Sequence, residues 1–217
     1  MTDLIGFNLL SKNLHIREFD QGDRPALQRI THTPGFKFFS LDPNDPDTEQ
    51  KYINKCLGNQ VVDPATGIRD NFRMAITYKD APDNCIGYVS FGGFSKANEA
   101  GNPETGLFVD PAESGKSIGL EATMALVTFV LAKPQYHDIA RVWFTTHPDN
   151  TAVLAMARLL NGRKNDTGII QEHDPIENYQ TAHGPEPRRV FSYERKSLKE
   201  PTRRLARLAE RFEIDLS

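Results

Sequence analysis

Short apolar runs separated by polar turns set the pattern of this chain. Residues 72–78 and 86–94 alternate apolar and polar side chains, which is the period of a strand with one buried face. Residues 80–84 between them contain proline, aspartate and asparagine, so the pattern predicts an antiparallel hairpin. Gly92 and Gly93 within the second run indicate a bulge or a bend.

The longest apolar segment follows a short strand and a loop of small residues. Residues 104–109 have the pattern of a strand, and residues 110–119 contain a proline, two serines and two glycines. Residues 120–132 are apolar nearly all round, which predicts a helix buried against a sheet. The first amides of such a helix have no partner within it and favour a phosphate group. This stretch is therefore the candidate site for the diphosphate of a cofactor.

The remaining elements alternate between the two kinds of pattern. Strands are expected at 14–17, 139–145, 169–170 and 189–193, and helices at 24–30, 48–57 and 150–160. The strand at 139–145 is apolar throughout, as expected of a strand covered on both faces. Residues 174–188 show no pattern and are predicted to be a long loop, acting as a lid or an interface. The order predicts an α+β fold with a mixed sheet.

The end of the chain has a different composition. Residues 198–217 are predicted to form a separate unit after a domain at 1–197. Its apolar residues fall on one face of a helix, and its arginines lie on the others. We expect this helix to pack on the domain or on a second subunit of a homodimer; a contact to an acidic partner or RNA is the alternative.

Composition narrows the functional classes. The 217 residues carry a net charge of -3, so no overall field favours nucleic acid or a membrane. No apolar run approaches the roughly 20 residues that span a bilayer, and the first ten residues do not resemble a secretory signal. Cys56 and Cys85 form no disulfide framework, and no histidines stand at metal-binding spacing. A cytoplasmic protein with reduced thiols and no metal is expected.

Two phosphate-binding motifs are incomplete in the loop. Gly115, Lys116 and Ser117 match the end of a Walker loop, but its opening glycine would fall on Asp110. A dinucleotide fingerprint needs three glycines after the first strand of an alternating fold, and here only Gly115 and Gly119 are present. An N-cap at 114–117 without a ligand is the simpler alternative.

The elements around this loop resemble one known superfamily. Five segments carry the likeness: Leu14-His15-Ile16-Arg17, Cys85-Ile86-Gly87-Tyr88-Val89-Ser90, residues 104–110, residues 115–122, and His147-Pro148-Asp149-Asn150. They resemble the GNAT acetyltransferases, and most closely the Rim-type branch that acetylates the N-terminal amines of ribosomal proteins. The resemblance covers residues 13–197.

The resemblance implies a fold, a co-substrate and a reaction. The fold is a mostly antiparallel sheet of about seven strands with helices on both faces and a splayed fourth and fifth strand. Acetyl-CoA lies in the splay, and a primary amine of a protein N-terminus or a small molecule attacks its thioester directly. The implied cofactor-binding residues are Leu107, Phe108 and Val109 for the pantetheine, Ser114, Gly115, Lys116, Ser117, Ile118 and Gly119 for the diphosphate, and Asn150 for the pantetheine.

Two residues are candidates for the general base. Glu104 matches an acidic position that some relatives use, and the alternative is a solvated carboxylate at the start of a strand. His147 is the second candidate, with capping of the next helix as its alternative. Tyr136 and His137 are expected in a surface loop. The acidic loop at 42–47 would favour a cationic amine, and a solvated loop is the alternative.

The sequence departs from the family pattern at five places. Ser114 replaces Gln or Arg, and Ser117 replaces a glycine in the diphosphate loop. Val153 replaces a serine, and Ala157 replaces the tyrosine that protonates the leaving thiolate in many relatives. Residues 162–163 are Gly-Arg where Gly-Phe is usual. A GNAT-like protein that binds acyl-CoA or a protein partner without turnover is therefore the second hypothesis.

Overall fold

The computed structural model describes residues 8–33, 45–65, 69–92, 103–133, 136, 138–160, 170–181, 184–199 and 203–214. Several sequence-based expectations fall outside these residues. They are part of the acidic loop, at 42–44, together with Gly93, His137 and the Gly-Arg pair at 162–163.

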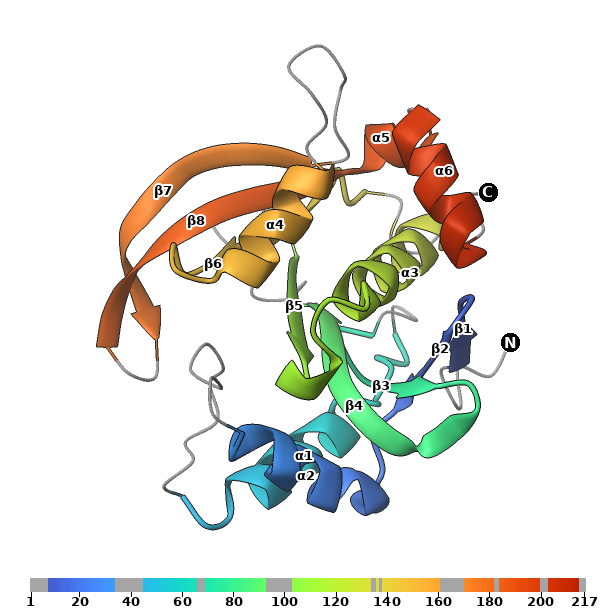
Figure 1. Ribbon diagram of the computed structural model, residues 1–217, viewed down its shortest axis with the longest axis vertical. Helices are drawn as coiled ribbons and strands as arrows, with labels where there is room; N and C mark the ends of the chain where they lie inside the picture. The colour runs from blue at the N-terminus through green and yellow to red at the C-terminus, as the bar shows by residue number, and fades with distance from the viewer. Residues whose placement is uncertain are drawn as a thin grey trace.

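One mixed sheet organises the described part of the chain (Figure 1). Its eight strands lie in the order β1-β2-β3-β4-β5-β6-β8-β7, and every neighbouring pair is antiparallel except β5 and β6. The predicted mixed, mostly antiparallel sheet is confirmed, with one more strand at its edge. The strands are β1 (Asn8–Leu10), β2 (Leu14–Glu18), β3 (Asn71–Tyr78), β4 (Ala81–Gly92), β5 (Glu104–Val109), β6 (Arg141–Thr146), β7 (Ile170–Thr181) and β8 (Gly184–Glu194).

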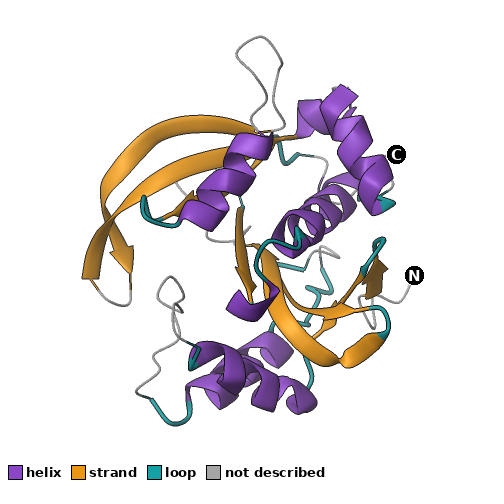
Figure 2. Cartoon of the chain, in the orientation of Figure 1, coloured by secondary structure: helices purple, strands orange, loops and turns teal. Residues whose placement is uncertain are grey.

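Helices cover both faces of the sheet, as predicted (Figure 2). On one face, α3, α4 and α6 pack over the larger core; on the other, α1 and α2 enclose a smaller core with Tyr88 and Cys85. Twelve of the 15 residues of α3 are buried, which confirms that its all-round apolar pattern means burial. The helices are α1 (Arg24–Thr31), α2 (Thr48–Gly58), α3 (Ile118–Ala132), α4 (Thr151–Leu160), α5 (Arg195–Lys199) and α6 (Arg203–Phe212).

The β3–β4 hairpin forms as predicted, but its irregularity lies elsewhere. Ile76 pairs with Gly87 and Thr77 pairs with Cys85, so Ile86 is the extra residue of a bulge. At Gly92 the pairing stays regular, and a Cβ there would lie 2.7 Å from the Cα of Asn71. That glycine therefore allows a close approach of two backbones and does not mark a bulge.

The parallel strands β5 and β6 meet at one end only. Glu104 pairs with Trp143, and the amide of Trp143 donates to the carbonyl of Pro103 at 2.9 Å. Beyond this pair the two strands have no further ladder partners, so the predicted splay is confirmed. In β6, Val142, Phe144 and Thr146 are buried and the alternate residues are half-buried, so one face of the strand is covered more completely than the other.

The prediction of a long loop at 174–188 was wrong. These residues belong to β7 and β8, a long curved hairpin at the edge of the sheet (Figure 1). The prolines in this segment obscure the strand pattern, because proline lacks the amide that a central strand needs. The strand β7 lies at the sheet edge and has irregular pairing on both sides of Ile176, so Pro175 is tolerated there.

Two buried contacts join distant parts of the chain. Tyr136 is 3% exposed, and its hydroxyl donates to the carbonyl of Arg69 at 3.1 Å, so the surface-loop expectation for this residue was wrong. In α6, Ala209 and Phe212 are buried, and the carbonyl of Phe212 accepts the amide of Lys12 at 2.8 Å. The arginine-rich helix thus packs on the domain through its apolar face.

Candidate functional site

A cavity of about 610 Å³ opens where β5 and β6 part. The two strands form its floor, and α3 and α4 form its sides. Nine of the ten residues expected to bind the co-substrate line this one cavity. These nine are Leu107, Phe108, Val109, Ser114, Gly115, Ser117, Ile118, Gly119 and Asn150.

The loop before α3 leaves the first amides of the helix without a side-chain cap. Ser117 is the N-cap residue, and its side chain makes no capping hydrogen bond. Its backbone is left-handed, with φ 64° and ψ 13°, and Gly115 also has a positive φ of 82°. A glycine suits both conformations best. Ser117 therefore holds the N-cap position without a capping bond, and this loop lines the cavity. Amides at a helix N-terminus are donors suited to an anion.

Asp110 is accounted for by local contacts. Its carboxylate accepts the amide of Ala112 at 2.9 Å and lies 3.4 Å from Nε of Arg29. The residue is 5% exposed and closes the turn before α3. A negative charge at this position is thus used to shape the loop, which agrees with the absence of a Walker motif.

Three polar atoms without partners belong to residues that line the cavity. They are Oγ1 of Thr123, Nε of Arg188 and the hydroxyl of Tyr193, each buried and without a hydrogen bond among the described residues. A buried polar group without a partner costs about 1–3 kcal/mol. A ligand rich in amide, carbonyl and phosphate groups, such as coenzyme A, fits a cavity that holds such groups.

The edge of β5 and the start of α4 complete the cavity. Residues 105–109 pair with β4 on one side and face the splay on the other, where an extended ligand can add a further strand to β5. Oδ1 of Asn150 accepts the amide of Val153 at 3.3 Å and caps α4. The amide nitrogen of Asn150 remains available to the cavity, which Val153 also lines.

Glu104 stands at the closed end of the splay, beside the cavity lining. Surrounding protein atoms raise the pKa of its carboxyl group, although the side chain keeps exposed surface, and Thr145 and Arg188 partly oppose the shift. Both of these residues line the cavity. The guanidinium of Arg188 lies 5.6 Å from the ring of Tyr179, whose pKa is raised by burial and by the charge of Glu104. A titratable cluster thus borders the cavity on the side of the β7–β8 hairpin.

The other two expected site residues are engaged elsewhere. Nδ1 of His147 accepts the amide of Asp149 at 3.1 Å, and His147 is not among the residues that line the cavity. Nζ of Lys116 lies 2.6 Å from Oε2 of Glu113, and this lysine points away from the cavity. The hydrogen bond to Lys116, followed by one from Tyr78, lowers the pKa of Glu113.

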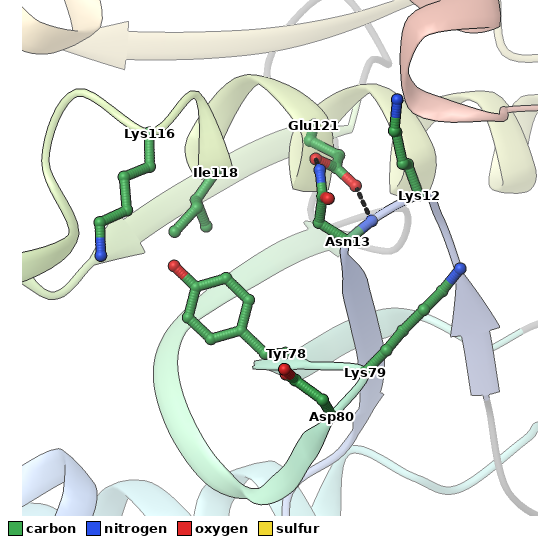
Figure 3. Close-up of a pocket in the computed structure, with 8 residues that line it drawn as sticks. All are labelled: Lys12, Asn13, Tyr78, Lys79, Asp80, Lys116, Ile118 and Glu121. Carbon is green, nitrogen blue, oxygen red and sulfur yellow. Dashed lines mark hydrogen bonds between the residues drawn. The ribbon is translucent and has the colours of Figure 1, made fainter.

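A second cavity of about 500 Å³ lies on the opposite flank of α3 (Figure 3). Figure 3 shows Lys12 and Lys79 on one side of Asn13, and Lys116 with Tyr78 on the other. The carboxylate of Glu121 at its wall is 1% exposed and accepts hydrogen bonds from Ser11 and twice from Asn13. All its bonds are internal, so this carboxylate joins β1–β2 to α3 and is not a binding group.

Other reactive groups in the described residues do not form a site. Burial raises the pKa of Cys56 and of Cys85 to about 12, so neither thiol is a nucleophile near neutral pH. Both cysteines are free, as expected. Among the described residues, no group of three or more His, Cys, Asp or Glu side chains is arranged to hold a metal ion. Of the described helices, none is long and apolar enough to cross a membrane.

Sequence patterns did not single out Thr123, Arg188 and Tyr193. The alternation of β8 indicates that Tyr193 points inward, and the period of α3 places Thr123 on a buried helix. Whether a buried hydroxyl finds a partner depends on residues far away in the chain. No local pattern could therefore reveal that these atoms lack partners among the described residues.

Comparisons with known proteins agree with this geometry. The model of the acetyltransferase (GNAT) domain matches residues 13–161. RimJ from Mycobacterium smegmatis, solved with CoA-disulfide, has a TM-score of 0.68 at 16% identity, covering 97% of this chain and 96% of that one. A GNAT acetyltransferase from Bacillus anthracis has a TM-score of 0.66 at 14% identity, covering 88% and 99%. RimL, a ribosomal L7/L12 alpha-N-protein acetyltransferase, has a TM-score of 0.61 at 15% identity, covering 89% and 97%.

The search of curated proteins found no match. The structural neighbours share the fold at low identity, while the family model matches about two thirds of the chain at the level of sequence. That match includes β5, the uncapped loop, α3 and the start of α4, which are the elements that build the cavity. This chain belongs to the GNAT acetyltransferase family.

Proposed function

We propose that the protein transfers an acetyl group from acetyl-CoA to a primary amine by direct attack within a ternary complex. One observation carries this proposal. The cavity in the β5–β6 splay joins a helix N-terminus without a side-chain cap, a strand edge that faces the splay and three buried donors without partners. These are the groups that a diphosphate, an extended diamide arm and a thioester require.

Acetyl-CoA would bind with its diphosphate at the loop before α3 and its thioester at the closed end of the splay. The amides of residues 115–119 hold the diphosphate, and the dipole of α3 adds a favourable field. The amide of Ser114 already donates to the carbonyl of Pro111 at 3.1 Å. The edge of β5 that faces the splay, at Leu107–Val109, pairs with the pantetheine, and the amide nitrogen of Asn150 donates to it from α4. The thioester then lies at the closed end of the splay, next to Glu104.

Glu104 is the better placed general base. An ammonium must lose a proton before it attacks, and a carboxylate with a raised pKa is a stronger base than an ordinary one. The interactions with Thr145 and Arg188 hold Glu104 beside the cavity. His147 is the second candidate, and its Nδ1 already accepts a hydrogen bond. A water molecule between Glu104 and the amine would extend its reach.

The acceptor is a cationic amine of a protein N-terminus or a small molecule. The name of RimL describes an enzyme that acts on the α-amine of a ribosomal protein, and we propose this class first. Near the splay, Glu186 lies 3.1 Å from Arg188, so Glu104 and Glu186 together outweigh the one guanidinium. The local excess of negative charge favours an ammonium over an acceptor that also carries a carboxylate.

Calorimetry with acetyl-CoA tests the co-substrate. Ser114 is exposed in the loop, so Ser114→Asp adds a negative charge beside the diphosphate without disturbing the core. We expect Ser114→Asp to weaken acetyl-CoA binding by about tenfold or more, the effect of about 1.4 kcal/mol of repulsion. Ser114→Asn has nearly the same shape and is the matched control.

Thiol release across a panel of amines tests the reaction. The panel contains peptide N-termini, polyamines and free amino acids. We expect release with the peptides, and we expect Glu104→Gln to slow it by about 100-fold or more. Binding of acetyl-CoA without any release would favour the alternative, a protein that has kept its ligand and lost its turnover. Absence of acyl-CoA binding would refute the proposal.

A further inference from the structure

We propose that the hydroxyl of Tyr193 donates a hydrogen bond to the sulfur of coenzyme A as the thiolate leaves. This role rests on the proposed acetyl transfer and adds a residue to it. Tyr193 lies on β8, it lines the cavity, and its hydroxyl has no hydrogen-bond partner among the described residues.

The order of elements along the cavity fixes where the sulfur lies. Val109 leads directly into the loop before α3, so the diphosphate end of the ligand lies at the end of β5. The pantetheine must then run back along β5 towards Glu104, where the splay closes at the Glu104–Trp143 pair. The sulfur and the acetyl group are at the far end of this arm. They therefore lie at the closed end of the splay.

Tyr193 is on the strand that borders this closed end. It pairs with Val142, the residue before Trp143 in β6. Val142, Phe144 and Tyr193 all belong to the core beneath α3 and α4, which is the side from which the ligand arm enters. The ring of Tyr193 packs 5.4 Å from that of Phe144, which also lines the cavity. This packing holds the phenol in place.

Two other donors without partners line the cavity, Oγ1 of Thr123 on α3 and Nε of Arg188 on β8, and neither belongs to a residue that pairs with β6 beside the closed end. The hydroxyl of Thr105 donates to the carbonyl of Ser90 at 2.7 Å and is already engaged. Ala157 in α4 is 2% exposed and has no donor group. A buried hydroxyl without a partner is unfavourable, so the unmet donor of Tyr193 points to a partner that the substrate supplies.

The leaving thiolate needs a hydrogen-bond donor and does not need to be protonated. The amine nitrogen bonds to the carbonyl carbon, the carbon–sulfur bond breaks, and its electron pair stays on sulfur as the thiolate. Glu104 takes the proton that the ammonium loses before attack, and the second proton, which the nitrogen loses as the amide forms, passes to solvent water. Burial raises the pKa of Tyr193 far above the value of about 8.5 for a thiol, so the phenol keeps its proton. A hydrogen bond to an ionised acceptor is about twice as strong as one between neutral groups.

Titration of bound coenzyme A tests the contact directly. The ultraviolet absorbance of the thiolate gives the pKa of the bound CoA thiol. We expect Tyr193→Phe to raise this pKa by about one unit or more and to lower kcat by about 10- to 100-fold, with KM for acetyl-CoA nearly unchanged. The melting temperature should stay level or rise, because an unmet hydroxyl is removed.

Two further variants of the protein make the test specific to the hydroxyl of Tyr193. Tyr136→Phe removes a buried hydroxyl outside the cavity, which donates to the carbonyl of Arg69, so it should lose stability and keep both the thiol pKa and kcat. Replacing Tyr193 by 3-fluorotyrosine makes the phenol a stronger donor and should lower the thiol pKa.

The outcomes separate this role from the proposed function. A thiol pKa and a kcat equal to those of the unchanged protein in Tyr193→Phe would overturn the role of Tyr193 and leave acetyl transfer standing. A shift of the same size in Tyr136→Phe would also overturn it. Failure of the unchanged protein to bind coenzyme A would overturn both.

Discussion

Replacing Ser117 by glycine measures the strain in the loop before α3. Ser117 has a left-handed backbone, which costs a residue with a Cβ about 1–2 kcal/mol. Glycine removes this cost, but its unfolded chain is more flexible by about 0.4–1 kcal/mol. We therefore expect Ser117→Gly to raise the free energy of unfolding by about 0.5–1 kcal/mol. For a domain of this size, that raises the melting temperature by about 1–3 °C.

Ser117→Ala is the matched control, because alanine keeps the Cβ and loses only the hydroxyl. The hydroxyl makes no capping bond, so we expect the alanine variant to be no more stable than the unchanged protein. Urea unfolding of the three proteins gives the difference, and calorimetry with acetyl-CoA shows whether the lost hydroxyl matters for binding. A glycine variant no more stable than the alanine variant would refute the strain argument.

Three other changes test separate parts of the structure. Glu121→Ala removes a buried carboxylate and leaves its donors, Ser11 and Asn13, without a partner. Urea unfolding should show the free energy of unfolding lowered by about 3 kcal/mol or more. A decrease below about 1 kcal/mol would contradict this anchoring role. Gly87→Ala places a Cβ 2.4 Å from the carbonyl oxygen of Phe108 in β5. We expect the free energy of unfolding to fall by about 1–3 kcal/mol and acetyl-CoA to bind more weakly. Acetyl-CoA binding unchanged in calorimetry would contradict this expectation. For Glu104, the raised pKa means that the ionised base is lost at a higher pH than for an ordinary glutamate. The acid limb of kcat/KM should therefore lie above a pH of about 4.3 and vanish in Glu104→Gln, and a limb at or below that value would count against this base.

Local patterns predicted the elements that build the site, since each depends on neighbours in sequence. The strand at 104–109 and the helix after it are bounded by a proline turn and by small residues, and both formed where expected. The β7–β8 hairpin was missed because its prolines hide the alternation, and only its place at the sheet edge makes them tolerable. The bulge at Ile86 was missed because a change of register depends on the partner strand.

The functional residues divide in the same way. The loop and strand residues expected to bind the co-substrate came together because a contiguous strand–loop–helix unit brings them there. Lys116 departs from this set because an adjacent carboxylate, Glu113, holds its ammonium group. The donors without partners became visible only in three dimensions, because an unmet hydrogen bond is a property of all surrounding residues and not of one segment.

The positions of the departures from the family pattern in the fold show how each one affects turnover. Ser117 adopts the left-handed conformation that suits a glycine, so the loop keeps its shape at a modest cost in stability. Ser114 is exposed, and its amide donates to the carbonyl of Pro111, so its side chain does not fill the cavity-lining loop. Ala157 belongs to the core beneath the helices, where it packs and offers no proton. Loss of a donor at that position would disable the reaction only if no other donor reached the sulfur, and Tyr193 places a phenol on the same side of the sheet. The substitutions in the loop and in α4 therefore argue for a rearranged acetyltransferase more than for a binding protein derived from one.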